Sequence, residues 1–315
     1  MPPRGAHAQW AHPLRRPRGR GAFRRAPQRT LRISRRDRET RREAALPRRR
    51  GNCDMMLVWT LAALGSGFTS GLLGLYVVGL NMPFLGIGMA HAAMAGAVWA
   101  LMAGAPVFPC ALAAALTAGA ALAWMATTRV RSDLGTLTSI LLSFTMGLAF
   151  LGIGMNQGDM SPMLSLVWGS LLFVRPLDVA LLFALGAVFC VFLFFCRRPL
   201  DTLLFSRGAA RSCGLNERPL LMVFMGLAAL VITINLKLTG GLLMYALLTN
   251  PAAAAFEVAA SMPSARRWAA GLGVSSTLGG FAVSYGLDLP TGACIVMMST
   301  ALFAVAAVYA RRKSP

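Results

Sequence analysis

Long apolar runs separated by short polar segments dominate the chain. Most runs are about 20 residues long, which is the length that a helix needs to cross roughly 30 Å of hydrocarbon. We expect helices at residues 56–80, 83–103, 107–126, 134–156, 176–196, 219–236, 240–258, 268–287 and 290–310. A further stretch from Met163 to Val174 is too short to cross, and we expect it at an interface or within the bundle. The pattern predicts an all-α, polytopic transmembrane helix bundle with about eight or nine spans.

Composition supports this fold class, because 56% of the residues are hydrophobic and only 13% are charged. A soluble protein of this length could not bury so much apolar surface within itself. The spans are rich in Gly, Ala, Ser and Thr, which let helix backbones approach closely in lipid. We therefore expect a tightly packed, multi-pass bundle that contacts membrane lipid.

Residues 1–54 differ from the rest because they combine 17 Arg residues with four acidic ones. Three interpretations fit this arm: translation that begins at Met55 or Met56, a solvated disordered tail, or a basic arm that binds nucleic acid or anionic lipid. We favour a mis-assigned start, since both methionines directly precede the first apolar run, and we expect no nucleic-acid partner. The predicted organisation is an Arg-rich disordered arm followed by one transmembrane domain at residues 55–312.

The basic segments between the spans predict the orientation of the bundle, because cytoplasmic loops are enriched in Lys and Arg. Those expected in the cytoplasm are Arg129 with Arg131, residues 197–218, Arg266 with Arg267, and residues 311–313. They place the C-terminus inside, and nine spans would then place residue 55 outside. An Arg-rich arm would resist export, so either the arm is not made or the first span is not a full crossing.

Polar residues inside apolar runs are the candidates for function, because each is costly in the membrane unless it is paired or wetted. His91 lies well inside the second run and is the only histidine after residue 12. Its imidazole could ligate zinc, manganese or iron during transport, or it could simply bond a neighbouring helix. Pro251, preceded by Asn250, interrupts the seventh run, and interrupted helices often line transport paths. The predicted substrate path is therefore His91, Asn250 and Pro251.

Other polar residues have a structural interpretation. We expect Glu257 and Asp288 at the membrane interfaces, and Asn235 and Lys237 near the outer end of the sixth run. The six cysteines are scattered without a metal-ligand spacing. No phosphate-binding loop motif and no nucleophile–base pair is present, so we expect no enzyme activity and no ATP binding of that kind by this chain.

Four segments resemble one known family. They are residues 71–78 (GLLGLYVV), residues 84–92 (FLGIGMAHA), residues 240–255 (GGLLMYALLTNPAAAA) and residues 284–293 (SYGLDLPTGA). The last two are similar to the family patterns G-x-L-L-x-x-A-L-L-x-x-P-A-A-x-A and S-Y-x-L-D-L-P-T-G-A. On these residues the chain, from about 56 to 310, resembles the permease family of zinc, manganese and iron ABC importers.

The resemblance implies a multi-pass permease of the bacterial inner membrane that carries a divalent transition metal and binds no cofactor itself. It further implies a permease homodimer, a separate cytoplasmic ATPase subunit and a periplasmic metal-binding protein. An alternative is an ATP-independent secondary carrier built on a similar bundle. By the same resemblance, Phe205, Ala209, Ala210 and Gly214 belong to a cytoplasmic loop that docks the ATPase; the alternative is an ordinary basic loop.

The segment around His91 departs from the family pattern. The resemblance implies an Asp four residues before the histidine, on the same helical face, but Ile87 occupies this position. A serine commonly next to the histidine is Ala90, and Gly79, Leu80 and Asn81 replace basic residues. Since an isoleucine side chain cannot ligate a metal, the sequence leaves open which metal is carried.

Overall fold

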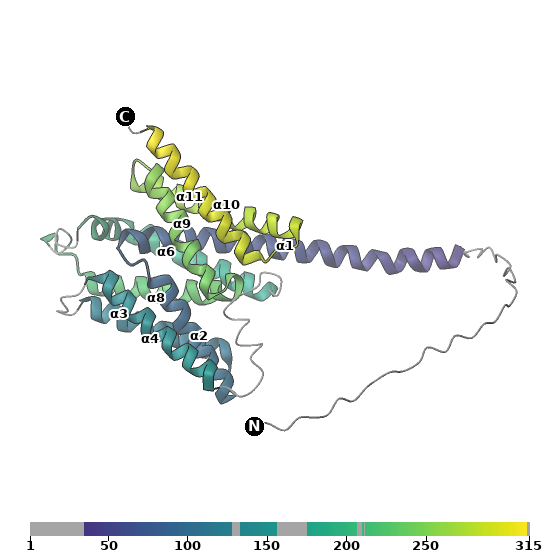
Figure 1. Ribbon diagram of the computed structural model, residues 1–315, viewed down its shortest axis with the longest axis horizontal. Coiled ribbons are helices and arrows are strands. Elements are labelled where there is room, and N and C mark those ends of the chain that lie inside the picture. The colour runs from purple at the N-terminus through teal and green to yellow at the C-terminus, as the bar shows by residue number, and fades with distance from the viewer. Residues whose placement is uncertain (1–34, 128–132, 156–174, 207–209, 211, 314–315) are drawn as a thin grey trace, which may run out of the picture. The chain divides into compact units, whose positions relative to one another are not determined.

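The computed structural model describes residues 35–127, 133–155, 175–206, 210 and 212–313. These residues form helices α1 (Arg35–Gly79), α2 (Leu85–Ala103), α3 (Val107–Thr127), α4 (Leu134–Met155), α6 (Pro176–Phe205), α8 (Glu217–Thr239), α9 (Gly241–Val258), α10 (Met262–Leu287) and α11 (Thr291–Lys313). Every predicted helix is present (Figure 1). The predicted short stretch from Met163 to Val174 lies outside the described residues.

Seven of the described helices are long and apolar enough to cross a membrane. They are α2, α3, α4, α6, α8 and α11 together with the Met55–Gly79 part of α1. The two others differ in composition: α9 carries Asn250 and Glu257, and α10 carries Arg266 and Arg267 in its first turns. The all-α polytopic fold predicted from the hydrophobic pattern is confirmed.

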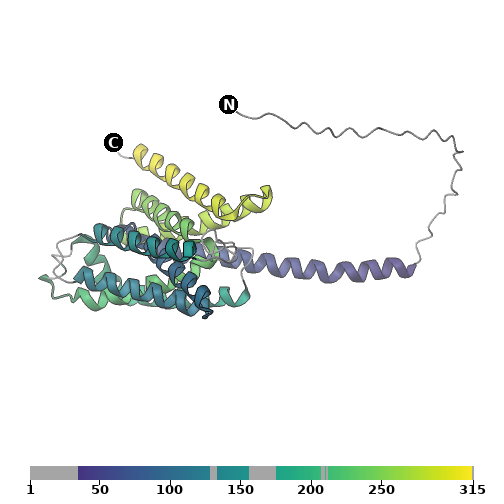
Figure 2. The same ribbon diagram turned by 60° about the horizontal axis from the view of Figure 1, so that its bottom comes forward.

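The chain divides into two units, Met1–Arg49 and Arg50–Pro315, and the bundle belongs to the second. Within it, α2 packs against both α3 and α4, while α9, α10 and α11 pack against one another (Figures 1 and 2). Helix α2 also contacts α8 and α9, so it joins the two groups. The predicted domain boundary at residue 55 falls inside α1, which begins at Arg35, and it stays a prediction.

Small residues allow the closest helix contacts. A Cβ atom at Gly67 of α1 would lie 2.8 Å from the Gly273 carbonyl carbon of α10, and one at Gly280 of α10 would lie 2.6 Å from the Ile295 backbone nitrogen of α11. Real Cβ atoms do not approach backbone so closely, and only glycine fits at these crossings. Such contacts hold transmembrane helices together by packing.

Two sharp turns position the last helices. Gly240, with φ 82°, turns the chain from α8 into α9, and this backbone conformation is nearly restricted to glycine. Asp288, with φ 51°, ends α10. The Ser284 hydroxyl then donates to the Leu289 carbonyl at 2.6 Å, while the Leu289 amide donates back to the Ser284 carbonyl at 3.2 Å. The two turns lie within the two long segments, residues 240–255 and 284–293, that carry the family resemblance.

Candidate transport site

His91 lies on α2 with only 2% of its surface exposed. Its Nδ1 is 2.9 Å from the carbonyl oxygen of Ile87, one turn earlier on the same helix. Because a carbonyl only accepts hydrogen bonds, this contact requires the proton on Nδ1. In the neutral ring the lone pair is then on Nε2, which is the atom able to ligate a metal. Residue 87 thus orients the His91 imidazole through its backbone carbonyl, although its side chain carries no carboxylate.

A side chain of helix α4 bonds the segment of α2 that precedes His91. The Thr145 hydroxyl lies 3.1 Å from the Gly88 carbonyl of α2 and 2.8 Å from the Leu141 carbonyl of its own helix. Among the described residues, no group of three or more His, Cys, Asp or Glu side chains could hold a metal ion. His91 is therefore not part of a preformed, tight metal site of those residue types within the described chain.

Helix α9 packs directly on the start of α2. The rings of Phe84 and Tyr245 stack with centroids 6.3 Å apart, and a Cβ atom at Gly86 would meet the side chain of Leu248. The structure therefore brings together the two helices that carry the predicted substrate path.

Within α9, the predicted path residues have defined surroundings. The Asn250 amide donates to the hydroxyls of Ser299 and Thr300 on α11, each at 3.1 Å. Pro251 is buried, and α9 continues through it to Val258. The side chain of Asn250 thus faces α11, whereas His91 lies on α2. Their assignment to a substrate path remains a prediction.

Buried polar contacts also join α1 to α8 and α9. The Asn235 amide of α8 lies 2.8 Å from the Val231 carbonyl and 3.4 Å from the Thr69 hydroxyl of α1. The Ser70 hydroxyl lies 3.9 Å from the Met244 sulfur of α9. Asn235 is fully buried, so it ties helices together inside the bundle.

The predicted ATPase-docking segment begins at Phe205, the last residue of α6. The Phe205 side chain is 82% exposed, whereas Ala210 is fully buried in the bundle core. The Ala210 amide donates to the Ser206 carbonyl and its own carbonyl accepts from the Leu215 amide, both at 3.0 Å. Gly214 has φ 73°, a conformation suited to ending a short helical turn. Ala209 lies outside the described residues.

A polar cluster at the base of this segment was not predicted as a site. Arg266 Nη1 of α10 lies 3.0 Å from the Tyr76 hydroxyl of α1 and 3.0 Å from both carboxylate oxygens of Asp201 on α6. From the sequence, Arg266 indicates only the orientation of the bundle, and Asp201 does not stand out. The available signal was the rarity of acidic residues, of which only seven follow residue 54.

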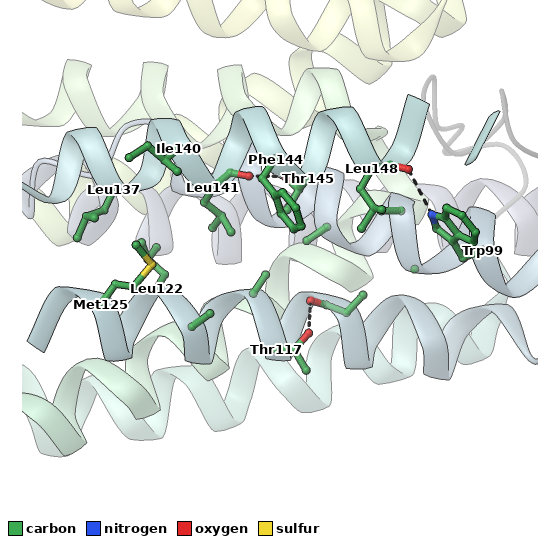
Figure 3. A pocket seen from close by; sticks show the side chains of 16 residues that line it. Trp99, Thr117, Leu122, Met125, Leu137, Ile140, Leu141, Phe144, Thr145 and Leu148 are labelled. Atoms are coloured by element: carbon green, nitrogen blue, oxygen red, sulfur yellow. Dashed lines mark hydrogen bonds between the residues drawn. The ribbon is translucent and has the colours of Figure 1, made fainter. Parts of the chain in front are cut away.

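An apolar groove of about 650 Å³ lies between α2, α3 and α4 (Figure 3). Its only described hydroxyls, from Thr117 and Thr145, bond backbone carbonyls. At one end the Trp99 indole donates to the Leu148 carbonyl at 3.3 Å. With no charged or imidazole side chain in its lining, the groove does not have the chemistry of a metal site.

Residues 52–310 match the ABC 3 transport family. The chain is 27% identical over 246 residues to the manganese transport system membrane protein MntC of Halalkalibacterium halodurans, covering 78% of this chain and 84% of that protein. It is 24% identical over 233 residues to the high-affinity zinc uptake system membrane protein ZnuB of Haemophilus influenzae, covering 73% and 88% respectively.

The fold is similar to a chain of the solved structure of PsaBC from Streptococcus pneumoniae in complex with Fab. The TM-score is 0.70 at 21% sequence identity, and the match covers 82% of this chain and 95% of that one. The family resemblance drawn from the four sequence segments is confirmed. This chain belongs to the ABC 3 transport family and is a multi-pass membrane permease subunit of an ABC transporter.

Proposed function

We propose that the chain is the membrane permease of an ATP-driven importer for a divalent transition metal, with manganese and zinc as the first candidates. The observation that carries this proposal is the family match over residues 52–310, together with relatives whose names specify manganese and zinc transport. The chain covers more than four fifths of both relatives, so the likeness extends over most of their length.

His91 would act as a transient ligand on the metal's path. Its burial removes competing water, and the Ile87 carbonyl orients the ring so that Nε2 can bind the ion. One imidazole without a neighbouring carboxylate binds a divalent metal weakly, and weak binding suits an ion that must be released on the other side.

The energy for transport would come from a separate ATPase that docks at residues 205–215. The exposed Phe205 ring offers an apolar contact, and the buried Ala210 anchors the segment in the bundle core. A periplasmic binding protein would deliver the metal at the opposite end. A second copy of the permease would cover part of α4, α6 and α11, which are less than a third buried within one chain.

Metal uptake by reconstituted protein tests the proposal. The permease, its ATPase and its binding protein are placed in liposomes, and uptake of Mn²⁺, Zn²⁺ and Fe²⁺ is measured with and without ATP. We expect ATP-dependent uptake of at least one metal, and none when the ATPase is omitted. Uptake by the permease alone under an ion gradient would contradict the proposal and favour a secondary carrier.

Substitution of His91 tests the ligand assignment. His91→Ala should lower ATP-dependent uptake by about tenfold or more, as expected when a metal-binding interaction of roughly 1.4 kcal/mol is lost. Thr145→Val is the matched control, because it removes a contact to the same part of α2 without removing a ligand. Equal uptake by the His91→Ala variant and the wild type, for every metal, would remove His91 from the mechanism.

A further inference from the structure

Three helices meet through polar side chains at the end of the bundle where α6 leads into the docking segment. Arg266 Nη1 contacts the Asp201 carboxylate and the Tyr76 hydroxyl, each at 3.0 Å. The Arg266 and Asp201 side chains are only 20% and 23% exposed, and Tyr76 is fully buried. An arginine–carboxylate pair with so little water around it is held more firmly than an exposed pair.

Apolar packing surrounds Tyr76 and the end of α6. The Tyr76 ring meets Phe224 of α8 edge to face, with ring centroids 6.2 Å apart. One turn beyond Tyr76, a Cβ atom at Gly79 would meet the Leu204 side chain of α6 and lie 3.2 Å from the Phe256 ring of α9. One face of the end of α6 therefore packs against the end of α1, near α9, and Asp201 bonds the start of α10.

The cluster also lies next to the segment that would receive the movement of the ATPase. Asp201 is one helical turn before the exposed Phe205, and the Ser206 amide still bonds the Thr202 carbonyl at 3.1 Å. The helix that carries Asp201 thus continues without a break to the start of the docking segment. Along α6, a displacement of Phe205 therefore reaches Asp201 one turn further into the helix.

We propose that Arg266 is a positioning residue for transport, which fixes the end of α6 to α1 and α10 so that these helices move together when the ATPase displaces residues 205–215. This inference rests on the proposed function. In it, Asp201 supplies the charge that holds the guanidinium, and the Tyr76 hydroxyl extends the link to α1. Without the link, α6 would move while α1 and α10 stay behind.

The test measures how many metal ions are moved per ATP hydrolysed by the complete complex in liposomes, with Mn²⁺ and Zn²⁺ as probes. Arg266→Met should leave assembly with the ATPase intact but lower this ratio by about fivefold or more, the lower end of coupling between distant sites. Arg266→Lys keeps the charge and should restore most of the ratio. Arg267→Met is the matched control, because it removes an exposed positive charge from the next position of the same helix.

Variants that conserve the fold make the result decisive. Tyr76→Phe keeps the buried ring and removes only the hydroxyl, and we expect a smaller fall in the ratio than for Arg266→Met. If Arg266→Met is not recovered as folded protein, Arg266→Lys, Asp201→Asn and Tyr76→Phe are measured instead. A ratio equal to that of the wild type in all folded variants would overturn the inference, since a purely structural role lowers the yield of folded protein but not the ratio.

A second readout separates this inference from the proposed function. Spin labels at residues 206 and 264, in a variant whose natural cysteines are replaced by serine, report the distance between the end of α6 and the start of α10. We expect this distance to stay constant through the ATP cycle with Arg266 present and to change in the Arg266→Met variant. If the wild-type complex hydrolyses ATP but moves no metal, the proposed function is wrong; if the distance changes with Arg266 present, the inference is wrong.

Discussion

The turns at residues 240 and 288 and the segment around His91 play different parts in the molecule. At the turns, the backbone itself requires particular residues: Gly240 has φ 82°, Asp288 has φ 51°, and Ser284 bonds the backbone beyond the end of α10. Around His91 the helix is regular, and no backbone geometry requires either an aspartate or an isoleucine at position 87. The turn segments follow the family pattern, and the His91 segment departs from it.

On the proposed function, this difference separates the residues that determine the fold from those expected to bind the metal. A substitution at a turn or a close helix crossing changes the stability of the bundle. On the proposed function, we expect a substitution at Ile87 or His91 to change which ions bind more than it changes the architecture of the bundle. We therefore expect the architecture of this permease to tolerate changes in the chemistry of its proposed path.

The largest expected effect is on stability, at the crossing of α10 and α11. A Cβ atom at Gly280 would lie against Ile295 Cα and 2.6 Å from its backbone nitrogen, and backbone atoms cannot rotate away. We expect Gly280→Ala to lower the free energy of unfolding by about 1–3 kcal/mol, even though alanine favours a helix interior by about 1 kcal/mol over glycine. The melting temperature of the purified protein in detergent measures this loss.

Gly271→Ala provides the control for this prediction. Gly271 lies on the same helix, but a Cβ atom there would have nothing within 4 Å. Its melting temperature should be unchanged or slightly raised, because only the gain in helix propensity remains. Equal melting temperatures for both variants would show that the close crossing does not hold α10 to α11.

A smaller effect, on binding rather than stability, is expected at Ile87. This residue is one turn before His91, and its carbonyl already contacts the ring, so a carboxylate at position 87 would share the face of the imidazole. We expect Ile87→Asp to strengthen binding of Mn²⁺ or Zn²⁺ to the purified protein by about tenfold, or roughly 1.4 kcal/mol. Isothermal titration calorimetry measures the affinity.

The neutral variant Ile87→Asn isolates the contribution of the charge. It has nearly the same shape as Ile87→Asp but lacks the anionic oxygen that a divalent ion prefers. We expect its affinity to stay near that of the wild type. Equal affinities for the Asp and Asn variants would place the metal path away from this face of α2.

The helices could be predicted from the sequence because the length of an apolar run by itself indicates a segment that crosses the membrane. Their ends were predicted less well where a helix leaves the membrane. The run at 176–196 ends before Arg197 and Arg198, yet α6 continues to Phe205. Hydropathy marks only the part of a helix that lipid surrounds, and the extension carries the charged Asp201 at the base of the docking segment.

The polar cluster could not be predicted, because it depends on packing between distant parts of the chain. Arg266 is 65 residues from Asp201 and 190 residues from Tyr76. Neither the hydrophobic periodicity nor the spacing of residues along the sequence relates positions that are so far apart. His91 could be singled out because a histidine inside an apolar run is conspicuous by itself, whereas its orientation by the Ile87 carbonyl needed coordinates.

The smallest effect is expected at Asp133, which precedes α4 and is exposed to solvent. The Thr136 hydroxyl donates to the Asp133 carboxylate and holds the pKa of this group below its usual value, with help from backbone amides of the first turn. Because the pKa is lower in the folded protein than in the unfolded chain, the charged carboxylate stabilises the fold above the unfolded pKa. This contribution is lost as the pH falls through the folded pKa.

We therefore expect Asp133→Asn, which keeps a capping side chain but no charge, to lower the melting temperature slightly at neutral pH. The difference from the wild type should shrink as the solution is acidified and vanish once the wild-type carboxylate is protonated. Asp133→Ala, which loses both cap and charge, should stay less stable than Asp133→Asn at every pH. A difference between wild type and Asp133→Asn that persists in acid would mean that the charge of Asp133 does not stabilise the start of α4. The effect of position 133 would then come from the shape of its side chain alone.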